Sequence, residues 1–285
     1  MAFSYGRRKE VAYGLHDSQL QFFKNDENFV TKGIVGTMTY TYREDIYNTN
    51  TLWAQYRNST ITDTVLYFND EYFLPQSTQQ ELLTFGYRFR ADHRDIRAYP
   101  LRGSFFEFSA IKQGIGVLRN EPDLLHLIST ARKYMQLSDR FFYHASIKGK
   151  LSGRTFAPYF NTRALGYGND LVRGYEFYVI NGQHFALFKS NFKYNLVKQR
   201  VIKFDAIPLE KFAKIPYAFY INLNADAGYV EDLFSIESNP LANTLLLGGG
   251  IGIDYVTYYD LVLRVEYSIN KFGENGIFLH FRAPI

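Results

Sequence analysis

Residues 171–183 read LVRGYEFYVINGQ and place two charged side chains, Arg173 and Glu176, in an apolar and aromatic stretch. The stretch closes 153–182, the longest link between segments that alternate as strands do. A structureless link of about 30 residues is uncommon in a compact domain and is usually functional. A guanidinium held there needs an acceptor, preferably a carboxylate in bidentate geometry. Asp226, on the strand after next, is the candidate.

The segments around this link alternate apolar and polar side chains with a period of two, which indicates half-buried antiparallel strands. The alternation is found in 34–43, 82–90, 140–151, 186–196, 215–228 and 259–270. About twelve strands are predicted on this basis, near 2–14, 30–43, 51–68, 80–91, 103–117, 126–138, 140–152, 183–197, 215–228, 243–256, 259–270 and 276–283. No helical domain is predicted, and 119–127 has room for one helical turn at most.

Periodicity alone fits two architectures: a soluble sandwich with an apolar core, and a membrane barrel whose apolar side chains face lipid around a polar lumen. Strand length favours the barrel, because a tilted strand needs about 9–11 residues to cross a bilayer. The aromatic content of 18% favours it too, since aromatic side chains suit strands and water–lipid interfaces. We therefore expect lipid-facing or interfacial positions for Trp53, Tyr217, Phe219, Tyr258 and Tyr259.

The links between the predicted strands alternate roughly between tight and long. Those at 136–140 and 256–260 are tight, whereas those at 92–102, 153–182 and 230–242 are long. Short turns at one rim and long loops at the other are typical of outer-membrane barrels.

Composition excludes several classes of function. The net charge is +4, with 32 basic residues scattered among 28 acidic ones, so no basic patch predicts nucleic-acid binding. Without cysteine, the chain has neither disulfides nor thiolate metal sites. No segment has the roughly 18 consecutive apolar residues of a membrane helix. The N-terminus, MAFSYGRRKEVAYGL, lacks the apolar core of a signal peptide, which by itself predicts a cytosolic protein.

No catalytic, metal or cofactor site is predicted. The glycines at 248, 249, 250 and 252 lie within a strand, so a tight bend or the close approach of a packed loop explains them better than a phosphate loop. The six histidines have no metal-ligand spacing. His144 and Ser146 lie two apart on one polar face, but the chain has no Gly-x-Ser-x-Gly elbow, so we interpret them as lumen lining.

Val172-Arg173-Gly174-Tyr175-Glu176 resembles the VRGY/F loop motif of the BamA/TamA outer-membrane assembly superfamily, which includes two-partner secretion transporters. Ala225-Asp226-Ala227-Gly228 resembles the family's later strand motif, although Asn224 stands where the family usually has Phe or Val. Tyr99-Pro100-Leu101-Arg102-Gly103 resembles its YPxRG turn. The resemblance implies that Arg173 folds into the barrel and pairs with Asp226. Glu176 is typical of members that look like those of Bacteroidetes.

The end of the chain resembles the terminal β-signal of outer-membrane proteins. The pattern covers Glu274–Phe281, with Gly276, Phe278, Leu279 and Phe281 at its characteristic positions and Phe281 as the residue recognised by the assembly machinery. By resemblance, the last strand forms a weak lateral seam with the first, where strands of unfolded client proteins pair by β-augmentation.

The resemblance implies a bacterial outer-membrane protein without enzymatic activity, which inserts client barrels or exports protein. Its expected partners are outer-membrane lipid or lipopolysaccharide, unfolded client proteins and accessory assembly lipoproteins. Family members usually have 16 strands behind POTRA domains, so residues 1–285 are expected to form one barrel domain lacking the signal, the POTRA domains and the first four strands. The alternatives are a passive channel or an outer-membrane enzyme on a 12-strand barrel, and a soluble lipid-binding β-protein.

Overall fold

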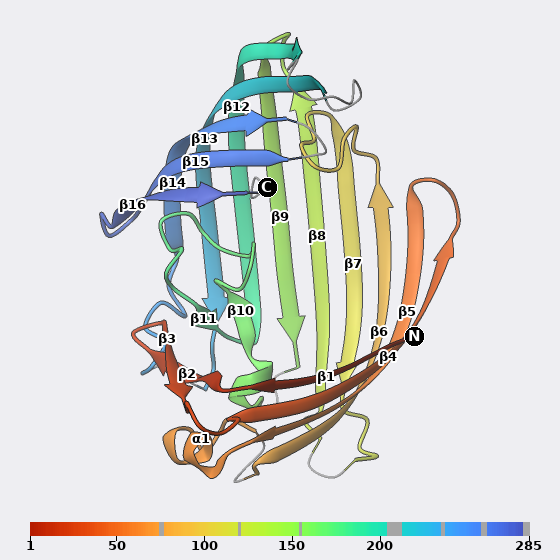
Figure 1. The fold of residues 1–285 in the computed structure, drawn as a ribbon, viewed down its shortest axis with the longest axis vertical. Coiled ribbons are helices and arrows are strands. Elements are labelled where there is room, and N and C mark those ends of the chain that lie inside the picture. Colours follow the sequence, from red (N-terminus) through yellow and green to blue (C-terminus); the bar gives the residue numbers. More distant parts are fainter. Residues whose placement is uncertain are drawn as a thin grey trace.

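The chain folds as one antiparallel sheet of twelve strands that curls around an interior, here called the lumen (Figure 1). The structure, a computed structural model, describes residues 1–73, 77–118, 121–153, 156–203, 213–234, 237–257 and 261–281. The strands, in sheet order, are β1 (Ala2–Arg8), β4 (Thr31–Arg43), β5 (Asn48–Ile61), β6 (Gln79–Asp92), β7 (Gly103–Gln113), β8 (Leu124–Gln136), β9 (Phe141–Ser152), β12 (His184–Lys203), β13 (Lys214–Glu231), β14 (Leu246–Val256), β15 (Val262–Asn270) and β16 (Asn275–His280). They correspond one for one with the predicted strands.

The sheet leaves its first and last strands as edges. Its order runs from β1 to β16, and within the described part of the chain no ladder joins these two strands. An edge strand carries a row of unpaired N–H and C=O groups that can pair with another strand. The two edges are therefore the places where the backbone can accept a further strand.

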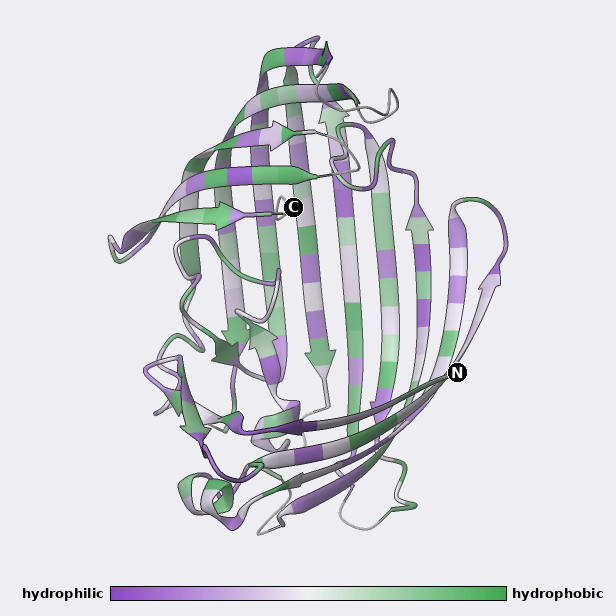
Figure 2. Cartoon of the chain, in the orientation of Figure 1, coloured by the Kyte–Doolittle hydropathy of each residue, from purple (hydrophilic) through white to green (hydrophobic). Residues whose placement is uncertain are grey.

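Side chains alternate between the two faces of the sheet, with the apolar rows outward and the polar rows toward the lumen. On β15, Val265, Tyr267 and Ile269 are 43–47% exposed, whereas Arg264 and Glu266 are at most 1% exposed. Colouring by hydropathy shows the same alternation along the strands (Figure 2). A soluble sandwich would bury its apolar rows, so this arrangement confirms the prediction of a barrel with a polar interior.

One prediction about the outer face is wrong. Trp53 lies opposite Gly86 in the β5–β6 ladder, on the lumen face, and a Cβ on Gly86 would lie 1.9 Å from the indole. The Arg88 guanidinium lies 5.2 Å from the centre of the ring. The reason is the alternation of side chains along a strand, which places Trp53 on the same inward face as Gln55, two residues later. Tyr217 and Phe219 face outward as predicted, and Tyr258 and Tyr259 lie outside the described residues.

The predicted first and third strands are shorter than expected. The first, 2–14, splits at Lys9, because β2 (Glu10–His16) leaves the large sheet and pairs with β3 (Gln19–Lys24). The third, 51–68, ends at Ile61, and Asp63–Phe68 forms the helix α1. A small core explains both changes, since Val65 of α1 packs into a buried cluster to which residues of β2 and β3 add contacts. The packing of Val65 in this core overrides the preference of a β-branched residue for strand.

Most long links lie on one rim of the sheet and most tight turns lie on the other. Residues 9–30, 62–78, 114–123, 153–183 and 232–245 connect strands at the rim that carries α1, β2 and β3. The predicted long link 92–102 is an exception, because it lies on the rim of the tight turns, and the tight turn 271–274 is another, because it lies on the rim of the long links. No helix in the described ranges has the length and hydrophobicity to span a bilayer.

Candidate functional site

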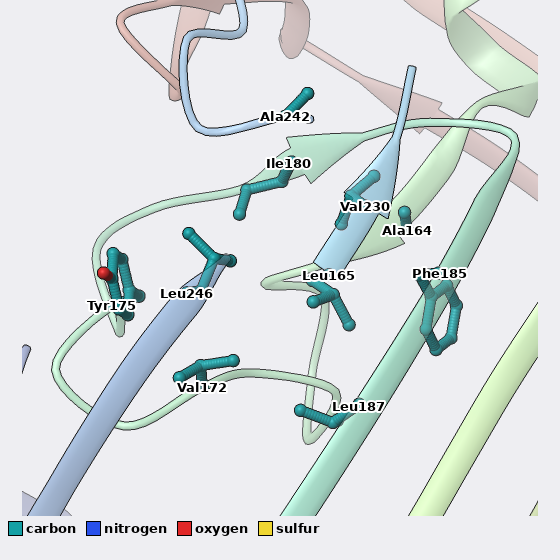
Figure 3. Close-up of a cluster of buried hydrophobic side chains, with 10 residues drawn as sticks. All are labelled: Ala164, Leu165, Val172, Tyr175, Ile180, Phe185, Leu187, Val230, Ala242 and Leu246. Atoms are coloured by element: carbon teal, nitrogen blue, oxygen red, sulfur yellow. The ribbon is translucent and has the colours of Figure 1, made fainter. Parts of the chain in front are cut away.

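The link between β9 and β12 folds into the lumen and is fastened there by an apolar cluster. It contains a short 3-10 helix, η1 (Tyr159–Asn161), and two short paired strands, β10 (Arg163–Leu165) and β11 (Ile180–Asn181). Ten buried residues make up the cluster (Figure 3): Ala164, Leu165, Val172, Tyr175 and Ile180 from the link, and Phe185, Leu187, Val230, Ala242 and Leu246 from the wall and the link 232–245. The inward rows of β12, β13 and β14 thus change from polar to apolar where the link packs.

Glycines let the backbone of the link reach the barrel wall. Gly174 has a positive φ of 82°, a conformation that glycine adopts without strain. A Cβ at Gly248 would lie 1.7 Å from the carbonyl oxygen of Arg173, and one at Gly228 would lie 2.5 Å from Cγ2 of Val172. Close approach of the packed loop therefore accounts for glycine at these two wall positions.

Arg173 is 2% exposed and lies between two carboxylates. Its Nη1 donates to both oxygens of Asp226 at 2.8 Å, and its Nε donates to Oε1 of Glu266 at 2.6 Å. Its backbone N–H also donates to Oδ2 of Asp226, at 3.3 Å. The structure thus brings together the residues of the VRGY motif and the strand motif, and it adds Glu266, which sequence reasoning missed.

The two carboxylates belong to a larger buried network. Glu266 Oε2 accepts from Nδ2 of Asn224 at 2.8 Å and lies 3.4 Å from Nη1 of Arg264. Arg264 forms a two-bond pair with Asp254, at 2.5 and 2.8 Å. The side chains of these two residues are at most 1% exposed. Burying charges is costly unless they are paired and hydrogen-bonded, and here each carboxylate has an arginine partner.

The network reaches the link at the opposite rim. The hydroxyl of Tyr99 donates to Oδ2 of Asp254 at 2.7 Å, and its ring packs 5.0 Å from the ring of Tyr220. Tyr99 belongs to the YPxRG-like turn, in which Gly103 has a φ of 105°. A continuous chain of polar contacts therefore runs from Arg173, near one rim, through the lumen to the turn at the other.

The ion-paired side chains of this network balance in charge, whereas Lys193, also buried, lies 3.8 Å from the centre of the Tyr99 ring. The ammonium of Lys189 lies 4.0 Å from Oδ2 of Asp226. With it, the buried network holds three cations and three anions: Arg173, Lys189, Arg264, Asp226, Asp254 and Glu266.

Glu176 does not join the arginine. Both of its carboxylate oxygens are buried and have no hydrogen-bond partner among the described residues. Burial, together with the nearby charge of Glu266, raises the pKa of Glu176 above its usual value. The motif's two charged side chains thus differ, because Arg173 is ion-paired with two carboxylates, whereas Glu176 has no cationic partner among the described residues.

The link also contacts the last hairpin of the sheet. The ring of Phe177 lies 5.6 Å from that of Phe278 on β16. The hydroxyl of Tyr178 donates to Oε1 of Glu274 at 2.9 Å, and Nδ2 of Asn270 donates to the carbonyl of Gly174 at 2.9 Å. The VRGY-like motif and the edge strand β16, which lie about 100 positions apart in the chain, therefore form one site.

The residues of the β-signal divide between the two faces of β16. Gly276 and Phe278 face the lumen, whereas Leu279 and Phe281 point outward and are 56% and 68% exposed. Phe278 is the residue of this set whose ring packs against Phe177 of the link.

Other chemistry is not assembled in the described ranges. They contain no group of three or more His, Asp or Glu side chains that could hold a metal ion. His144 and Ser146 face the lumen from β9, and the ring of His144 packs 4.5 Å from that of Tyr134.

Comparison with known proteins finds matches among solved structures. No protein-family model matches the chain, and no curated protein does. Among solved structures, it is similar to BamA from Haemophilus ducreyi lacking POTRA domains 1–3, with a TM-score of 0.62 and 12% identity. The match covers 90% of this chain and 56% of that one.

The fold is a barrel similar to that of this BamA structure. At this identity the likeness concerns the fold alone, and the chain spans little more than half the length of the structure it matches.

Proposed function

We propose that this chain is the barrel of an outer-membrane protein that inserts or exports other proteins. The observation that carries the proposal is the buried Arg173–Asp226–Glu266 site, which fastens an inward-folded loop to β13 and β15, while the same loop contacts the edge strand β16. A passive channel does not require a loop tied both to a buried ion network and to the edge of the sheet.

The outer face supports a location in the outer membrane. Long strands such as β5 and β6, of 14 residues each, exceed the roughly 9–11 residues that a tilted strand needs to cross a bilayer. Exposed apolar side chains recur on their outer face, including Leu52 and Phe85. Lipid, including lipopolysaccharide, is the partner that such a surface fits.

The edge of β16 is the proposed place of action. Its free backbone groups offer hydrogen bonds to a strand of an unfolded client barrel protein, which is recognition by β-augmentation. The link touches this strand through Phe177 and Phe278, so the docked loop supports the edge while the client strand pairs. No covalent step and no cofactor belong to this function, and accessory lipoproteins are proposed partners at the rims.

Site-directed disulfide cross-linking tests the proposal cleanly, because the chain has no cysteine of its own. A cysteine replacing Leu279 on β16 should cross-link to cysteines in an unfolded outer-membrane client. Val265→Cys is the matched control, because that outward residue lies on β15, which has a neighbour on each side. Cross-links at Leu279 no stronger than at Val265, together with steady ion conductance, would favour a passive channel and overturn the proposal.

A further inference from the structure

A second feature of the lumen lies between the wall of β5–β9 and the start of the inward link. It is a cavity of about 290 Å³, at the lower end of the usual range for small-molecule sites. Twelve residues line it: Gln55, Arg57, Leu82, Thr84, Ile111, Gln113, His126, Ile128, Lys150, Phe160, Asn161 and Arg163. None of the described contacts of the Arg173 network involves this lining.

The charge of the lining has one sign. Arg57, Lys150 and Arg163 are cationic, and no aspartate or glutamate is among the lining residues. No described residue forms an ion pair with any of these three side chains. This contrasts with the Arg173 network, in which buried cations are matched by buried anions. Cations that converge without an anion repel one another, and an anionic ligand would remove that repulsion.

The polar side chains of the cavity are hydrogen-bonded to one another in part, as between Gln113 and both His126 and Asn161, but Arg57 is not fully paired. The Nε of Arg57 is buried without a partner in the described part of the chain, and its guanidinium makes one long bond, of 3.4 Å, to Gln55. Lys150, 6% exposed, donates to the carbonyl oxygens of Arg163 and Gly182. The site is therefore built from the wall and from the link together, and it contains a guanidinium whose Nε has no partner among the described residues.

We propose that this cavity binds the phosphate group of an organic phosphate or diphosphate. Planar guanidinium forks match phosphate oxygens in bidentate geometry, and an ammonium adds a compact point charge. The amide side chains of Gln113 and Asn161 offer further donors. Apolar side chains, among them Ile111 and Phe160, give the carbon part of such a ligand a dry surface.

Binding has a mechanical consequence for the loop. Arg57 and Lys150 belong to the wall, whereas Asn161 and Arg163 belong to the link. A bound phosphate would bridge the two and favour the docked loop over the released one, since a ligand that prefers one state shifts the equilibrium toward it. The inference is independent of any client protein.

The chain carries its own reporter for this test. Trp53 is the one tryptophan, and it lies two residues before Gln55 in the same inward row of β5, about 7 Å along the strand. Purified protein in a non-ionic detergent is titrated with inorganic pyrophosphate while Trp53 fluorescence and heat of binding are followed. Short-chain phosphatidic acid is titrated separately, so that a lipid headgroup and a free phosphate are distinguished.

Two variants and a control decide the outcome. Arg57→Gln and Arg163→Gln should each weaken binding about tenfold or more, because each removes a charge-assisted contact. Arg200→Gln changes the net charge equally at an exposed position outside the cavity, and it should bind like the native chain. Saturable binding with this pattern supports the site, whichever ligand binds more tightly. No saturation by either ligand at millimolar concentration, or equal weakening in the Arg200 variant, overturns it.

Discussion

Replacing Arg173 by alanine removes the cation that lies between two buried carboxylates, and its effect follows from their burial. The Asp226 and Glu266 side chains are fully buried and that of Arg173 is 3% exposed. Exposed ion pairs are worth about 0–1 kcal/mol, whereas removing one partner of a buried pair costs about 3–5 kcal/mol because the other charge is left uncompensated. The second regime applies here.

Neighbouring cations set where in that range the cost lies. Lys189 lies 4.0 Å from Asp226, and Arg264 lies 3.4 Å from Glu266, so each carboxylate keeps one partial partner. We therefore expect about 3 kcal/mol, at the lower end of the range. This free energy is lost from the docked state of the loop, while the sheet keeps its own ladders.

Hydrogen exchange measures this loss directly. The backbone amides of Tyr175 and Tyr178 donate to carbonyls within the loop, at 3.1 Å each, and that of Val179 donates to Ser18 at 2.9 Å. Their protection should fall about a hundredfold in Arg173→Ala, since 1.4 kcal/mol corresponds to a factor of ten. Amides of the ladder between β6 and β7 should exchange as before.

Two further variants refine the test. Arg173→Lys keeps the charge but not the forked geometry, so protection should be intermediate. Arg200→Ala, at an exposed position, should leave the loop unchanged. Loop protection in Arg173→Ala within threefold of the native value would refute the reasoning, because the arginine would then not hold the loop.

Three other substitutions test the packing around this site. Gly248→Ala should displace the loop and lower its exchange protection, because the new Cβ would lie 1.7 Å from a loop carbonyl; Gly36→Ala, with no atom within 4 Å of its Cβ, should not. Tyr99→Phe removes one of several donors to Asp254, so it should cost about 0.5–1.5 kcal/mol and lower the thermal midpoint by a few degrees; an unchanged midpoint would contradict this. The raised pKa of Glu176 means that the docked loop binds its proton more tightly than the released loop, so docking should weaken as pH rises from about 4.5 through the raised value. Glu176→Gln should abolish that dependence of loop protection on pH, and a dependence that survives would assign it to another group.

The strand pattern and the direction of each row could be predicted from the sequence. Successive side chains on a strand point to opposite faces, so a period of two in residues such as Arg264, Val265, Glu266 and Tyr267 states which side chains share a face. Strand length and aromatic content then favoured the membrane barrel over the soluble sandwich. Trp53 shows that the type of a residue does not by itself predict which face it occupies. It lies two positions from Gln55 on the same strand and therefore faces the lumen, although its side chain is apolar.

Glu266 illustrates what local reasoning misses. In the sequence it is one polar residue in an alternating strand, 93 positions from Arg173. The two meet because the loop packs against Gly248 of β14, and β14 lies between β13, which carries Asp226, and β15, which carries Glu266. A run of small residues between two acid-bearing strands was the available signal for it.

The sequence by itself determined twelve strands and the face of most of their side chains, because alternation is a property of the extended backbone and needs no distant partner. Only the tertiary structure decided the end of the strand at Ile61, the departure of β2 from the sheet and the joining of the loop to β16. Each of these depends on which segments meet when the sheet curls, and such contacts between distant residues leave no periodic trace in the chain.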